Sequence, residues 1–217
     1  MACSIPNKRP QSLGEEIANS ISHGIGLAAA IALTPILIIV ANANGGATEI
    51  VASSIFGSTL ILMYLMSTLY HALPQSRAKR IFKILDHCAI YILIAGTYTP
   101  FTLVVLGGAW GWSIFGVIWG LALLGVIFKT TGGLRYPGLS IAIYILMGWM
   151  VLIAIKPLWE QIPLWGFIWL CIGGAAYTLG VIFYVAHCLR YNHLIWHLFV
   201  LSGTSCHCIA VFNYATS

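Results

Sequence analysis

Charged residues are scarce in this sequence. Only 7% of its 217 residues are Asp, Glu, Lys or Arg, whereas 60% are hydrophobic and the mean hydropathy is +0.94. Soluble domains carry roughly 25% charged residues, so the composition excludes an ordinary soluble enzyme or nucleic-acid-binding domain. The sequence therefore predicts an integral membrane protein.

A disulfide framework is also missing. The six cysteines include no C-x-x-C pair, and most of them fall within apolar segments or near basic loops. Cys206 and Cys208 flank His207, but residues two apart on a helix point in directions that differ by about 200°. We therefore expect packing cysteines rather than a disulfide scaffold or a cysteine metal cluster.

Long apolar runs fill most of the chain, and windows of about 20 residues delimit seven predicted membrane spans. The first run is too long for a signal peptide and lacks a convincing cleavage site. The fold class predicted is all-α: a seven-transmembrane-helix bundle in a single domain, 17–214, preceded by a short cytoplasmic N-terminal segment, 1–16. The spans expected are 17–41, 50–71, 84–106, 110–129, 138–155, 164–186 and 193–214.

The basic residues set the orientation of this bundle. Nine of the ten Lys and Arg residues lie before span one or in alternate loops on the same side, and Lys156 is the exception. The positive-inside rule then predicts a cytoplasmic N-terminus and an outer C-terminus. Because the net charge of +5 is explained by these loops, no nucleic-acid partner is expected.

Several polar residues are predicted to meet near the cytoplasmic side. His193 and His197 lie four residues apart, so they share one helix face and can bind one metal ion. His71 ends span two at this level, Asp86 begins span three there, and Ser67 lies one turn deeper than His71. The predicted topology thus brings the five residues to one depth in the membrane.

Three imidazoles with an open fourth position are typical of catalytic zinc, whereas a structural site is closed by a fourth protein ligand. Asp86 is then either a fourth ligand or the group that holds and deprotonates a water molecule, whose pKa zinc lowers to about 7. Ser67 would steady this water or an oxyanion. Asp86 could instead form an interfacial ion pair with Lys83 or act as a carboxylate at the helix start. Ser67 could instead be a helix-packing serine.

The other histidines have less specific positions. His207 lies about 15 Å beyond His197 along a helix, so it shares the face but not the ion. His87 is rotated by about 100° from Asp86 and is expected to be a polar residue at a helix start. His23 falls in the first turns of span one, also on the cytoplasmic side.

The order of these residues resembles the hemolysin III proteins, the bacterial branch related to the progestin and adipoQ receptors. The resemblance implies zinc held by His71, His193 and His197 in a bacterial inner-membrane protein, with Asp86 and Ser67 nearby. It also places the chain in a wider group that includes the alkaline ceramidases, which hydrolyse lipid amides. The motifs are Glu16-x2-Asn19-x3-His23-x2-Gly26, Ser67-x3-His71, Asp86 and His193-x3-His197-x9-His207.

The leading hypothesis is therefore a zinc-dependent intramembrane hydrolase that acts on a membrane lipid amide or ester. The alternative is a non-enzymatic, zinc-stabilised sensor or regulator of lipid composition or fluidity. Zinc or proton transport is disfavoured by the apolar helix between His197 and His207. A cytolytic pore is disfavoured because no amphipathic segment is suited to line one. The lipid and the oligomeric state stay open.

Overall fold

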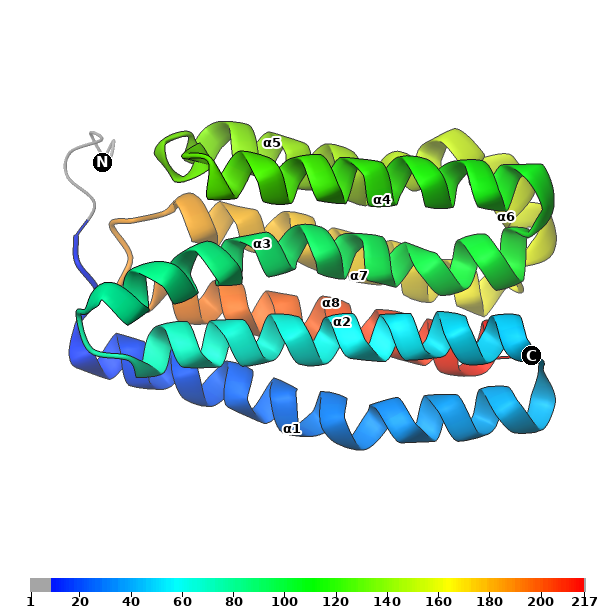
Figure 1. The fold of residues 1–217 in the computed structure, drawn as a ribbon, viewed down its shortest axis with the longest axis horizontal. Coiled ribbons are helices and arrows are strands. Elements are labelled where there is room, and N and C mark those ends of the chain that lie inside the picture. Colours follow the sequence, from blue (N-terminus) through cyan, green and yellow to red (C-terminus); the bar gives the residue numbers. More distant parts are fainter. Residues whose placement is uncertain (1–8, 217) are drawn as a thin grey trace.

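In the computed structural model, which describes residues 9–216, long helices run side by side along one axis (Figure 1). A π-helical turn, Phe101–Leu106, continues α3, and short 3-10 turns cover Gly133–Arg135 and Met150–Ala154. The α-helices are α1 (Leu13–Asn44), α2 (Ala47–Ala72), α3 (Arg77–Pro100), α4 (Gly108–Thr130), α5 (Pro137–Gly148), α6 (Ile155–Gln161), α7 (Leu164–Val185) and α8 (Asn192–Tyr214).

Within residues 9–216, seven helical segments are long and apolar enough to cross a membrane, which confirms the predicted all-α class. The fifth segment combines α5 and α6 and runs over Pro137–Gln161, so it passes the predicted end at residue 155 and contains Lys156. The first segment begins at Leu13, inside the N-terminal segment predicted over 1–16; positions 1–8 of that segment lie outside the described residues.

Local capping explains why α1 begins early. The Ser12 backbone N–H donates to Glu15 Oε2 at 2.8 Å, and the Glu15 N–H donates to Ser12 Oγ at 3.4 Å. This reciprocal pair is a capping box, which satisfies N–H groups that the first helical turn leaves unpaired. The other Glu15 oxygen accepts from the Tyr191 backbone N–H at 2.8 Å, so the same side chain joins the starts of α1 and α8.

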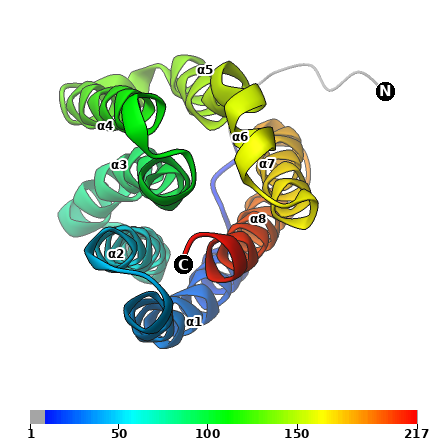
Figure 2. The same ribbon diagram turned by 90° about the vertical axis from the view of Figure 1, so that its right-hand side faces the viewer.

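Seen from its end, the bundle is a ring (Figure 2). The helices follow one another around the ring in chain order, and α8 closes it beside α1. Consequently α1 packs against α2 on one side and α8 on the other. The two helices that carry the predicted histidine ligands are thus bridged by the first helix.

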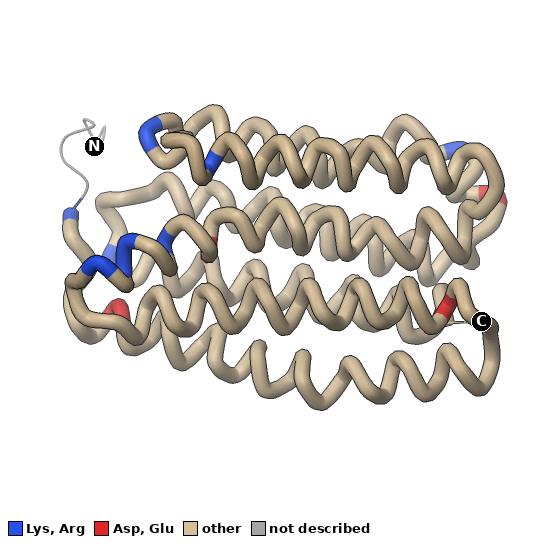
Figure 3. Tube along the Cα trace, in the orientation of Figure 1, with Lys and Arg blue, Asp and Glu red and all other residues tan. Residues whose placement is uncertain are grey.

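The charges are unevenly distributed along the bundle (Figure 3). Within residues 9–216, every Lys and Arg except Lys156 lies towards the end where α1 begins, which we call the basic end. Glu49 and Glu160 lie at the opposite end. The positive-inside rule assigns the basic end to the cytoplasm.

Small residues permit close contact between neighbouring helices. Gly96 of α3 faces Thr59 of α2, and a β-carbon added to this glycine would lie only 2.7 Å from Thr59 Cβ. Gly116 of α4, by contrast, has nothing within 4 Å of the position that a β-carbon would take.

We expect Gly96→Ala to destabilise the bundle by about 1–3 kcal/mol, because the added methyl group overpacks the α2–α3 contact. Thermal unfolding in detergent should show a lower Tm than wild type. Gly116→Ala is the matched control and should leave Tm unchanged or slightly higher, since alanine favours a helix over glycine. An unchanged Tm for Gly96→Ala would contradict the close contact.

Candidate metal centre

Three histidines meet near the basic end of the bundle. His71 comes from the last turn of α2, and His193 and His197 come from the first two turns of α8. One potential ligand atom from each lies within 4.8 Å of the others. The His193 and His197 ring centroids are 4.6 Å apart, as expected for residues one turn apart on a helix. The structure therefore brings the predicted ligand residues together.

A partly buried carboxylate, that of Glu16, fixes the first of these rings. His71 Nδ1–H donates to Glu16 Oε2 at 2.8 Å, and Lys79 Nζ donates to Glu16 Oε1 at 3.0 Å. A carboxylate accepts this bond only if Nδ1 carries a proton, so in the neutral ring Nε2 is the nitrogen with the free lone pair. His71 Nε2 is buried and has no hydrogen-bond partner in the described part of the chain. This is the state in which imidazole binds a metal ion.

The second ring is fixed by α1 in the same way. His197 Nδ1 lies 3.3 Å from the Asn19 carbonyl oxygen and 3.1 Å from Ser22 Oγ. The Ser22 hydroxyl itself donates to the Asn19 carbonyl at 2.8 Å. Since a carbonyl only accepts, Nδ1 is the protonated nitrogen and Nε2 is the one left for a ligand. Helix α1 thus supplies the outer hydrogen-bond partners of two candidate ligands.

A fourth histidine lies directly against this cluster. The His23 ring stacks on that of His197 with centroids 3.5 Å apart and planes within 9°, and its edge meets Tyr64. Both His23 nitrogens are buried without a hydrogen-bond partner in residues 9–216. The sequence placed His23 at the same end of the bundle as the other histidines but gave no sign of this stacking.

Asp86 and Ser67 line a cavity together with His193 and His197. Asp86 does not belong to the cluster of potential ligand atoms, which favours the predicted role beside the ion over that of a fourth ligand. The one ion pair of Asp86 within the described chain joins Oδ2 to His87 Nδ1 at 3.6 Å, so an interfacial pair with Lys83 is not formed. The Ser67 hydroxyl is buried and unpartnered in this same part of the chain.

The expectation that His87 lies at a helix start is wrong, because α3 begins at Arg77, ten residues earlier. His87 borders the same cavity as Asp86, although its Nδ1 also lies 2.7 Å from the Lys83 carbonyl oxygen. The cavity is wide enough for two consecutive residues of α3 to reach its wall, so a 100° rotation does not separate them.

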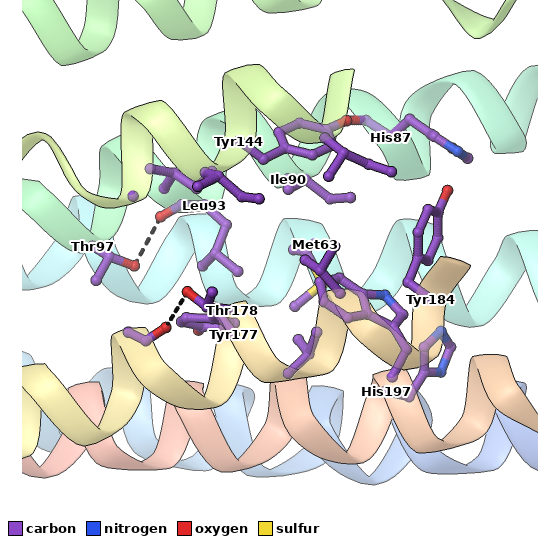
Figure 4. Close-up of a pocket in the computed structure, with 18 of the residues that line it drawn as sticks. Met63, His87, Ile90, Leu93, Thr97, Tyr144, Tyr177, Thr178, Tyr184 and His197 are labelled. Atoms are coloured by element: carbon purple, nitrogen blue, oxygen red, sulfur yellow. Dashed lines mark hydrogen bonds between the residues drawn. The ribbon is translucent and has the colours of Figure 1, made fainter. Parts of the chain in front are cut away.

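The cavity continues from this polar end into the apolar interior (Figure 4). Its wall contains aliphatic and aromatic side chains such as Met63, Leu93 and Tyr177. His207 lies on the same wall, and its Nε2 lies 3.3 Å from the Leu170 carbonyl oxygen. As predicted, His207 is not part of the three-histidine cluster.

Comparison with known proteins identifies the family. A profile described as Haemolysin-III related matches residues 11–208. The chain belongs to the hemolysin III family. Among hemolysin III proteins, Hemolysin-3 of Bacillus cereus is 46% identical over 195 residues, which cover 90% of this chain and 89% of the relative. The Hemolysin-3 homolog of Bacillus subtilis is 44% identical over 203 residues, covering 94% and 95% of the two chains.

A more distant relative of this hemolysin III protein comes from an animal. The monocyte to macrophage differentiation factor of Homo sapiens is 25% identical over 210 residues, which cover 92% of this chain and 84% of the relative. The resemblance noted in the sequence is thus confirmed for the family.

The donor set fits a zinc ion. Three nitrogen ligands and one open position suit zinc, and the buried, unpartnered Nε2 of His71 is a group that a cation would satisfy. Residues that sequence reasoning left without a role, above all Glu16, hold the rings that would bind it.

We expect Glu16→Gln to weaken zinc binding about tenfold, because outer hydrogen-bond partners typically contribute this much to metal affinity. The carboxylate accepts from both His71 and Lys79, one on each oxygen. The glutamine side chain has a single acceptor oxygen, so it can accept from only one of them, because its NH2 group is a donor. Competition with a chromophoric chelator on the purified protein measures the affinity. Glu160→Gln removes a carboxylate at the opposite end and should leave the affinity unchanged. Equal affinities for both variants would exclude the positioning role.

Proposed function

We propose that this multi-pass membrane protein is a zinc-dependent hydrolase that cleaves an amide or ester bond of a membrane lipid in the bacterial inner membrane. One observation carries the proposal. His193 and His197 of the three-histidine cluster, Asp86 and Ser67, whose hydroxyl has no hydrogen-bond partner within residues 9–216, all line one cavity with a mainly apolar wall. A hydrolase for lipids needs this combination of a polar reaction centre and an apolar channel.

The residues of the chain divide the chemical work between them. His71, His193 and His197 would hold zinc, which when bound supplies a Lewis acid and an acidified water. The Asp86 carboxylate would accept a proton from the attacking water and return it to the leaving group. The Ser67 hydroxyl would donate a hydrogen bond to the oxygen that gains negative charge.

The surrounding side chains would orient the lipid. Leu93, Ile94 and Val200 line the deeper part of the cavity and would contact an acyl chain. Because this wall is apolar, it keeps bulk water from the reacting bond except at the polar end. The chain's own groups thereby favour a long-chain lipid over a soluble amide or ester.

A second candidate function is a zinc-stabilised regulator of membrane lipid composition. The observation that favours it is the position of the cluster, because His71 and the α8 histidines connect helices from opposite ends of the sequence. In that case zinc would stabilise the ring and no lipid would be consumed.

We expect about one zinc ion per chain in the purified protein, held by a site with three protein ligands. Elemental analysis of detergent-purified protein should show that His71→Ala, His193→Ala and His197→Ala each lose the metal. His207 lines the same cavity but lies outside the cluster, so His207→Ala should retain the zinc. A wild-type protein without zinc, prepared without chelators, would remove the basis for the hydrolase.

We expect Asp86→Asn to retain zinc but to lose at least about 100-fold in turnover, which is the usual contribution of a general base. The assay follows release of labelled fatty acid from a panel of N-acyl and O-acyl lipids in proteoliposomes. Glu160→Gln is the matched control and should behave as wild type. If Asp86→Asn turns over lipid as fast as wild type, Asp86 is not the general base. If zinc-bound wild type shows no turnover of any lipid in the panel, the regulator is favoured over the hydrolase.

A further inference from the structure

A second cavity lies at the basic end, between α3, α4, α5 and α7. Its volume is about 330 Å³, and it is lined by three cationic side chains from different elements, Lys83, Lys129 and Arg135, together with Ser140. No carboxylate lines it in the part of the chain that the structure describes. We call it the basic cavity.

Lys129 is the unusual residue of this cavity. It lies in the last turn of α4 and is only 2% exposed. None of the ion pairs within residues 9–216 includes it, and its Nζ donates to the Gly133 carbonyl oxygen at a long 3.5 Å. A buried cation without a counter-charge is costly, and in membrane proteins such groups mark binding sites.

We infer that the basic cavity binds a phosphate group, carried by the head group of an anionic membrane lipid or present as free phosphate. An anion there would neutralise Lys129 and receive further donors from Lys83 and Arg135, which surround one volume. Charge-assisted hydrogen bonds of this kind are the strong ones. Basic pockets between transmembrane helices on the cytoplasmic side commonly bind anionic head groups.

The geometry favours the lipid as the source of the phosphate. The basic cavity and the cavity of the candidate metal centre share the wall residues His87, Ile141, Tyr144 and Tyr184. Tyr184 stands between His87 and His197 in Figure 4. A lipid with its phosphate in the basic cavity therefore has an apolar volume directly beside it for an acyl chain. The inference does not require zinc or turnover, so it stands or falls separately from the hydrolase.

The test is a thermal-shift titration of the detergent-purified protein with phosphatidylglycerol, with phosphatidylcholine and with inorganic phosphate. A ligand that binds only the folded state raises Tm as its concentration exceeds Kd. Phosphatidylglycerol should raise the Tm of wild type, and Lys129→Met should abolish the shift. Without anionic lipid, Lys129→Met should have a Tm at least equal to that of wild type, because an unneutralised buried cation has been removed.

Two further variants separate the basic cavity from general charge attraction. Arg135→Gln should bind phosphatidylglycerol at least about tenfold more weakly than wild type, since a contact to a charged group is lost. Arg80→Gln removes an exposed charge at the same end, outside the cavity, and should bind as wild type. A shift with inorganic phosphate alone would assign the site to the free anion. No shift with either probe, or equal shifts in Lys129→Met and wild type, would overturn the inference.

Discussion

The hydrogen bond between Glu16 and His71 is the contact on which the basic end depends. It joins α1 to α2, and Lys79 adds α3 to the same carboxylate. The Glu16 side chain is only partly exposed, and donors from α2 and α3 satisfy both of its carboxylate oxygens. The adjacent Glu15 accepts from the first turn of α8. Two consecutive glutamates therefore hold four helices in register around the three histidines.

Different helices orient the histidine rings and enclose the cavity. The contacts of α1 keep the histidine rings in one orientation, while α3, α5 and α7 enclose the apolar volume beside them. The basic cavity adjoins this volume across His87 and Tyr184. The candidate ligands and the cations of the basic cavity thus lie towards the same end of the bundle, beside an apolar volume.

Hydropathy and loop charge predicted all seven spans, and the depth of each polar residue followed from the spans. That is why the sequence alone assigns His71, His193 and His197 to one level. Depth does not say which helices are neighbours around a ring, so the bond from Glu16 to His71 and the stacking of His23 on His197 were not predictable. The error at His87 has a different cause: the first turns of α3 are rich in Lys and Arg, so hydropathy places the start of this helix too late.

The closure of the ring by α8 beside α1 has a consequence for biogenesis. Helices enter the membrane in the order of their synthesis, and α8 is the last of them. Until it arrives, Glu16 and His71 can already pair, but the place opposite the Asn19 carbonyl has no imidazole to fill it. The three-histidine cluster therefore forms only after α8 has been synthesised and has packed beside α1.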